Sequence, residues 1–175
     1  MPSIDPNSAA EERVFATYGR AMHGAQALEH WLRILVQVHR VATKSFASHA
    51  QLEPAFDALS TSTMGMVFAA LRSLVHNPPL EEKLTLAVTE RNRLAHQYFG
   101  QWSDVWTGVE TEIRMIEDAD RVRNLFEETT QHLMSIIGDH LDTIGSNPDE
   151  YIPGLAQRIS DIAGDGHPAG LTSEA

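Results

Sequence analysis

Apolar residues recur at helical spacing along most of the chain, and no segment shows a sustained alternation of apolar and polar residues. The longest such pattern follows a capping box formed by Ser8 and Glu11 and ends near Thr43 or Lys44. Its members alternate at spacings of four and three, as on the buried face of a packed helix: Val14, Tyr18, Ala21, Ala25, Leu28, Leu32 and Leu35. This segment is predicted to be a long core helix.

Three further core helices follow from the same periodicity. Thr61, Ser62 or Thr63 can cap the first, whose apolar stripe is Met64, Phe68, Leu71 and Val75. Pro78 and Pro79 separate it from the next, whose stripe is Leu80, Leu84, Ala87 and Leu94. The last is predicted from about Val109 to Ile144 with Gly145 as its C-cap, burying Val109, Ile113, Ile116, Val122, Phe126, Leu133, Ile137, Leu141 and Ile144. A short helix is expected within 54–59, and a loop with Trp102 and Trp106 over 100–108.

The order and length of these segments predict an all-α fold, an up-and-down helical bundle with two long antiparallel core helices. Residues 1–145 are expected to form the bundle. Residues 146–175 are rich in glycine and proline and are expected to be a partly flexible C-terminal extension. Because long amphipathic helices expose more apolar surface than one copy can cover, a homodimer is expected.

The amino-acid composition and charge of the chain argue against several classes of function. The chain has no cysteine, which excludes disulfides and thiolate metal sites. No apolar run is long enough to span a bilayer and no secretory signal opens the sequence, so we expect a cytoplasmic protein without a membrane partner. The net charge of −11 disfavours a general nucleic-acid coat. His132 and His140 with Asp139 have no partners at metal-ligand spacing, and we expect neither a metal nor a cofactor.

Residues 90–99 contain four kinds of polar side chain that could form a site: a guanidinium, an amide, an imidazole and a phenol. Arg91 falls on the buried stripe between Ala87 and Leu94, where a guanidinium is costly unless it is paired or lines a wet cavity. Asn92 and His96 are four apart and share one side of the helix, and Tyr98 is the next step of the stripe. Two interpretations follow. The group is a nucleotide or RNA site, or it is a buried cluster with Glu90 or a carboxylate from another helix that fixes the register of the bundle.

The motif Arg91-Asn92, three residues, then His96-Gln97-Tyr98 resembles the Arg-x4-His-x-Tyr pattern of HEPN domains (higher eukaryotes and prokaryotes nucleotide-binding). It is especially similar to the toxins of HEPN and nucleotidyltransferase toxin–antitoxin pairs. The motif is the specific part of this resemblance, while the architecture over 8–145 is a generic helical bundle. The resemblance implies a small all-helical bundle and metal-independent RNA cleavage at a site shared across a dimer.

The resemblance also implies residue roles. Arg91 would hold the scissile phosphate, His96 would act as general acid or base, and Asn92 would orient the imidazole or bind a phosphate oxygen. Tyr98 matches the position that partner nucleotidyltransferases modify. The expected function is an endoribonuclease, a toxin or phage-defence effector, with RNA or a nucleotide as ligand and an antitoxin or nucleotidyltransferase as partner. The alternative is a non-catalytic HEPN-like module that binds a nucleotide or a protein.

Overall fold

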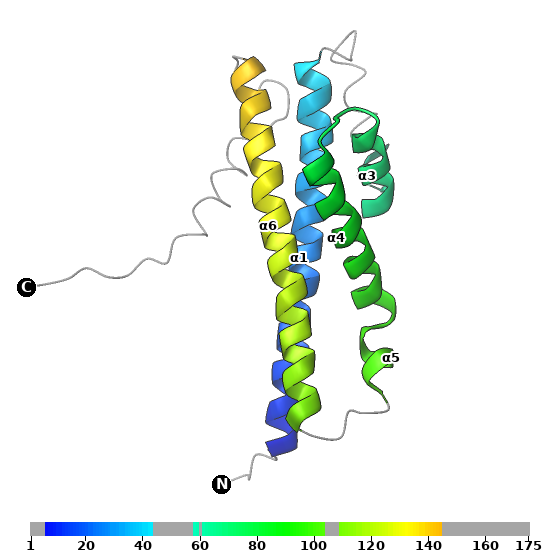
Figure 1. Cartoon of the computed structure of the whole chain (residues 1–175), viewed down its shortest axis with the longest axis vertical. Coiled ribbons are helices and arrows are strands. Elements are labelled where there is room, and N and C mark those ends of the chain that lie inside the picture. The colour runs from blue at the N-terminus through cyan, green and yellow to red at the C-terminus, as the bar shows by residue number, and fades with distance from the viewer. Residues whose placement is uncertain (1–5, 44–57, 60, 104–108, 145–175) are drawn as a thin grey trace, which may run out of the picture.

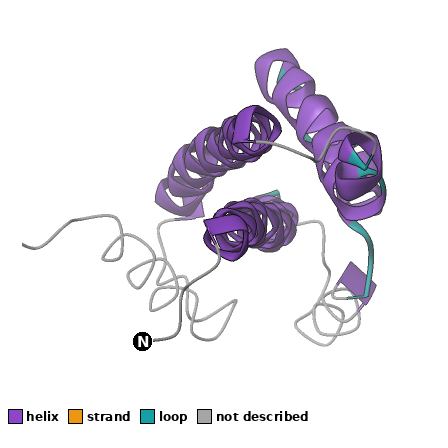
Figure 2. Cartoon of the chain, turned by 90° about the horizontal axis from the view of Figure 1, so that it is seen from below, coloured by secondary structure: helices purple, strands orange, loops and turns teal. Residues whose placement is uncertain are grey.

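The computed structural model describes residues 6–43, 58–59, 61–103 and 109–144. Its elements, in chain order, are α1 (Pro6–Ala42), α3 (Met64–Arg72), α4 (Pro78–His96), α5 (Tyr98–Trp102) and α6 (Val109–Ile144). Figure 2 looks along the bundle and shows helices but no strand in the described part of the chain. The prediction of an all-α helical bundle is therefore confirmed.

The two long helices, α1 and α6, run parallel, so the prediction of an antiparallel pair was wrong (Figure 1). His39, near the end of α1, contacts His140, near the end of α6. Earlier in both helices, a Cβ added at Gly24 would lie 3.5 Å from Cβ of Phe126. In both pairs, the two residues lie at similar distances from the starts of their helices, as parallel packing requires.

α4 is the helix that runs in the opposite direction. Ion pairs join Lys83 to Glu128 and Arg93 to Asp118, so the numbering rises along α4 as it falls along α6. α3 is likewise antiparallel to α4 and therefore parallel to α1. The prediction assumed that each helix reverses the one before it. α3 instead runs parallel to α1, so each later helix has the direction opposite to the predicted one.

The stripe predicted for α1 is confirmed, because its members are buried except Tyr18, which is partly buried against the core. Farther along, α1 is buried on several sides, including Trp31, Ile34 and Val38. α1 is therefore the central helix of the bundle. Its predicted start was wrong, since the helix begins at Pro6 and Ser8 lies inside it rather than at an N-cap. The fixed φ of proline suits the first turn of a helix.

The bounds predicted for α6 are confirmed, but the buried face of its first turns is not the predicted one. Val109 is 70% exposed and Ile113 is 50% exposed. The buried stripe instead alternates at three and four residues from Glu112 onward: Glu112, Met115, Ala119, Val122, Phe126, Thr129, Leu133 and Ile137. The prediction followed apolar residues and so passed over a glutamate and a threonine that lie on the true stripe.

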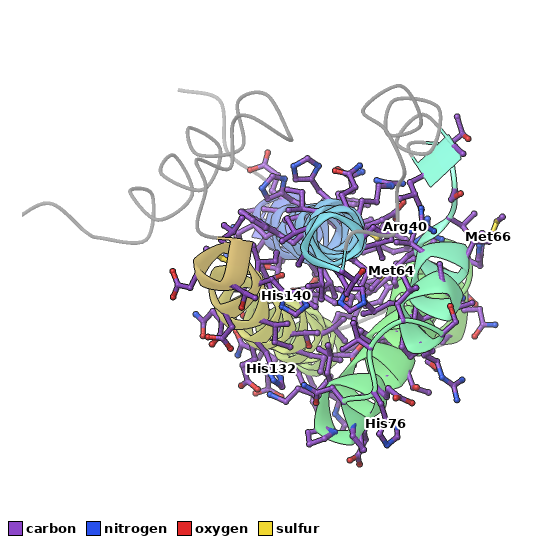
Figure 3. The ribbon with its side chains drawn as sticks, turned by 90° about the horizontal axis from the view of Figure 1, so that it is seen from above. Arg40, Met64, Met66, His76, His132 and His140 are labelled. Atoms are coloured by element: carbon purple, nitrogen blue, oxygen red, sulfur yellow. The ribbon has the colours of Figure 1, made fainter. Side chains whose placement is uncertain are left out.

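The joins around α3 and α4 are set by local capping. Thr63 accepts a hydrogen bond from the backbone N–H of Met66, as predicted, and Asn77 accepts one from Leu80 at the start of α4. Met64 is buried whereas Met66 is exposed (Figure 3), so only the first of these methionines fills the core. Trp102 ends α5 rather than lying in a loop, a further correction.

The remaining expectations for 54–57, Trp106, Gly145 and 146–175 lie outside the described residues.

Leu94→Ala tests the phase of α4. Leu94 is 1% exposed, and its truncation is expected to lower the free energy of unfolding by about 2–5 kcal/mol. The matched control is Leu86→Ala on the same helix, where a leucine 47% exposed makes the expected loss within about 0.5 kcal/mol. Urea unfolding of the two variants measures the difference, and equal losses would mean that α4 is rotated from the position described here.

Candidate functional site

The predicted motif is divided between two helices. α4 ends at His96 and α5 begins at Tyr98, with Gln97 between them at φ −130° and ψ −15°. The N–H of Gln97 still donates to the carbonyl of Arg93 at 2.8 Å, which closes the last turn of α4. α5 then begins at Tyr98, which is buried, as its predicted place on the stripe requires. The four motif side chains therefore do not surround one surface.

Three of the four motif residues lie toward solvent at the end of α4. His96 and Asn92 are exposed, and Arg91 is half-buried. The Arg91 guanidinium donates to Oδ1 of Asn92 at 3.2 Å. Among the residues with a defined position, no carboxylate forms an ion pair with Arg91. Helix geometry points Arg91 and His96 about 140° apart, so in one protomer they face different directions.

Tyr98 lies in the core rather than at the surface. It is 1% exposed, its ring packs against that of Tyr18 at a centroid distance of 5.1 Å, and its hydroxyl donates to the carbonyl of Met115 at 2.6 Å. Burial and, after it, the charge of Asp118 raise the pKa of Tyr98 to about 12. A modifying enzyme cannot reach this hydroxyl while α5 is packed, so modification of Tyr98 would require α5 to leave the core.

A network of four charges holds α4 against α6 beside the motif. Arg93 lies between Glu90 of its own helix and Asp118 of α6, at 2.7 and 2.9 Å. Arg121 closes the network, 2.8 Å from Asp118 and 3.3 Å from Glu90. The side chains of Glu90, Asp118 and Arg93 are 12%, 18% and 20% exposed, and that of Arg121 is 55% exposed. Each charge has an opposite partner on both helices, which fixes the register of α4 on α6.

The electrostatics of Arg93 follow from this arrangement. Burial by itself lowers the pKa of Arg93, but hydrogen bonds to Asp118 and Glu90 outweigh it and raise the pKa above its ordinary value. The hydrogen bond to Asp118 is also the largest cause that raises the pKa of Arg121. Both guanidiniums therefore stay charged at any pH at which the protein folds, and the carboxylates between them are neutralised.

Sequence reasoning anticipated a register-fixing cluster that included Glu90 but assigned it to the wrong arginine. The signal that identifies Arg93 is a repeated spacing: Glu90 and Arg93 are three apart on α4, and Asp118 and Arg121 are three apart on α6. When such pairs face each other on antiparallel helices, they form the alternating network observed here. Arg91 lies two positions away and does not take part.

The remaining candidates do not form a metal site. Within the described ranges, no group of three histidine, aspartate or glutamate side chains lies close enough to hold a metal ion. His132 and His140 are not brought together, but His140 contacts His39 of α1, with Nε2 of His140 2.9 Å from Nδ1 of His39. Sequence reasoning missed this pair because it placed α1 and α6 antiparallel.

No protein-family model, curated protein or solved structure matches this chain. None of the helices in the described ranges is long and apolar enough to cross a bilayer.

The environment of Tyr98 gives a pH prediction. A phenol in water titrates near pH 10, whereas Tyr98 in the folded protein is expected to ionise near 12. Because the folded pKa is raised, the stabilisation that it represents is complete below pH 10 and is lost as the pH rises through about 12. Ultraviolet titration of the folded protein should show a late phenolate component that disappears in Tyr98→Phe. A single step near pH 10 for all phenols of the folded protein would contradict the burial of this hydroxyl.

Proposed function

We propose that this protein is a HEPN-like, metal-independent endoribonuclease, a toxin or phage-defence effector, whose site contains Arg91, Asn92 and His96. The supporting observation is that the described bundle does not use these three side chains. Arg93 and its partners meet the need for a register-fixing cluster, and Arg91 has only Asn92 as a hydrogen-bond partner in the described part of the chain. Polar groups that the fold does not require are better explained by a ligand.

The chemistry of the three groups fits cleavage of a phosphodiester. Imidazole exchanges protons readily near neutral pH, so His96 is assigned as the general acid or base at the ribose hydroxyl or the leaving oxygen. The guanidinium of Arg91 has donors spaced to match two phosphate oxygens, and it would bind the scissile phosphate as charge develops. Asn92 already accepts a hydrogen bond from Arg91 and is assigned to orient that guanidinium or bind a phosphate oxygen.

The divergence of Arg91 and His96 supports a homodimer in which each copy completes the other's site. The last turn of α4, α5 and the first turns of α1 and α6 gather at one end of the bundle (Figure 1). Apolar side chains are exposed in the same elements, with Phe15 at 52%, Val109 at 70% and Ile113 at 50%. A second copy packed on this end would cover apolar surface beside His96.

The acidic total charge is compatible with RNA because carboxylates of α4 and α6 beside the motif are paired with arginines. Glu90 and Asp118 are held between Arg93 and Arg121, and on the far side of α6 Arg123 pairs with Asp120 and Glu127. Among the described residues no carboxylate pairs with Arg91, which would attract phosphate locally even though the whole chain carries −11. An RNA substrate places the activity in the cytoplasm.

An antitoxin that covers the end of α4 is the partner that fits this proposal. A nucleotidyltransferase acting at Tyr98 would first require that hydroxyl to leave the carbonyl of Met115. The alternative function is a non-catalytic module, in which the same arginine and histidine bind a nucleotide or a protein without cleavage.

The test is cleavage of total RNA or transfer RNA by purified protein in EDTA. His96→Ala is expected to lower the cleavage rate about 10²- to 10⁴-fold, the usual effect of removing a positioned acid or base. The variant should keep the wild-type melting temperature and the wild-type mass in light scattering, because His96 is exposed. Arg91→Lys keeps the charge but loses the paired donors and is expected to fold, dimerise and fail to cleave.

Two matched controls separate the site from surface charge in general. His23→Ala removes another exposed histidine, and Arg13→Lys alters another exposed arginine; both are expected to cleave at the wild-type rate. A wild-type protein that is inert on every RNA tried, together with a lower melting temperature for His96→Ala, would reject the enzyme. It would leave the binding module, with the histidine acting in stability.

A further inference from the structure

α1 and α6 finish at the same end of the bundle, the end at which α4 begins (Figure 1), and a contact between two histidines lies there. Nδ1 of His39, in the last turn of α1, lies 2.9 Å from Nε2 of His140 on α6. The two rings are 5.1 Å apart at their centroids and inclined by 51°, so they meet edge to edge rather than stacked. In Figure 3, viewed from above, His140 lies on the side of α6 that faces α1. This is the side-chain hydrogen bond that joins these two helices near their C-terminal ends.

The partners of the two rings assign their protons. Nδ1 of His140 lies 2.9 Å from the carbonyl oxygen of Ile136, and a carbonyl can only accept. His140 therefore carries a proton on Nδ1, and in its neutral form its Nε2 is an acceptor. The proton in the contact must then belong to Nδ1 of His39. In the neutral pair, His39 therefore donates to His140, and His140 donates to the backbone of α6.

One added proton preserves this series of hydrogen bonds, and a second proton breaks it. A first proton on Nε2 of His140 makes that nitrogen the donor, and His39 accepts at Nδ1 once its own proton has moved to Nε2. Nδ1 of His140 still donates to Ile136. A second proton leaves N–H groups on both sides of a 2.9 Å contact and two positive charges on adjoining rings. The hydrogen bond between the helices is then lost, and the two rings repel each other.

The groups around the two histidines favour the loss of their hydrogen bond as the pH falls. Burial, and then the charge of His140, lowers the pKa of His39 below its ordinary 6.5, although the C-terminal end of α1 by itself favours a positive charge there. Of the neighbouring charged groups, Asp139 and Asp142 on α6 are exposed and Arg40 on α1 is half-buried.

Charged groups from the other helices that pack nearby are engaged elsewhere. Arg72 and His76 contact Glu81, and Lys83 contacts Glu128. In the part of the chain that the structure describes, no carboxylate or third histidine lies with the pair in a group that could hold a metal ion. The ion pairs of the described residues include neither His39 nor His140.

We propose that His39 and His140 form a proton-sensitive latch, which joins the C-terminal ends of α1 and α6 while the pair carries at most one positive charge and releases them when both rings are charged. The lowered pKa of His39 determines whether the latch stabilises the fold at high or at low pH. The contribution of the latch to stability is complete above the ordinary pKa of about 6.5 and is lost as the pH falls below it.

Hydrogen exchange of the backbone amides tests the latch at the place where it acts. Between pH 7.5 and 5, protection of residues 39–42, corrected for the intrinsic pH dependence of exchange, is expected to fall about two- to tenfold, as for the loss of one hydrogen bond. Protection in the middle of α4 should not change. His39→Gln can still donate to His140 but cannot titrate, and its protection should vary less than about twofold over the same range. The control His23→Gln alters an exposed histidine and should behave as the wild type.

A wild-type protein whose end of α1 responds to pH as His39→Gln does would overturn the proposal. Nitrogen-15 spectra of the wild-type imidazoles give an independent check that needs no variant. At pH 8 they should show His140 protonated on Nδ1 and His39 protonated on Nδ1, and the opposite tautomers would also overturn it. The pair is remote from Arg91 and His96, so neither result depends on whether the protein cleaves RNA.

Discussion

The alignment of α4 on α6 depends on Arg93, which lies between two carboxylates that are themselves mostly buried. Leucine and alanine stripes pack α4 into the bundle, and an apolar stripe that repeats every three or four residues can pack in more than one register. The alternating charges of Glu90, Arg93, Asp118 and Arg121 do fix it, because a shift of one turn would place like charges together. The end of α4, and with it the position of His96, follows from this one network.

The network also separates the polar residues that hold the fold from those proposed to bind RNA, over a few positions of one helix. Arg93 and Glu90 turn toward α6 and serve the fold. Arg91, half-buried, and the exposed Asn92 and His96 take other directions and are left without a described structural partner except each other. Tyr98, after the break at Gln97, returns to the core and anchors α5 to Met115. A substrate or a second copy of the chain is the kind of partner that gives the remaining three side chains a purpose.

Much of the helix pattern was predictable, since the α1 stripe, the cap at Thr63 and the bounds of α6 depend on local sequence alone. Three features were not. The parallel course of α1 and α6 depends on the path of a long connection, which periodicity does not constrain. The buried face of early α6 includes Glu112, which apolar pattern rules discard. The end of α4 before Gln97 has no proline or glycine to mark it, although the stripe did predict the burial of Tyr98.

The central claim is that Arg93 holds the fold whereas Arg91 serves the proposed RNA cleavage. Paired alanine variants test it most directly. Arg93→Ala leaves Glu90 and Asp118 mostly buried with only Arg121 as a partner, and is expected to lower the free energy of unfolding by at least about 2 kcal/mol. Arg91→Ala is expected to change it by no more than about 0.5 kcal/mol and to abolish RNA cleavage in EDTA. Equal destabilisation by the two variants, or a larger loss for Arg91→Ala, would contradict the account.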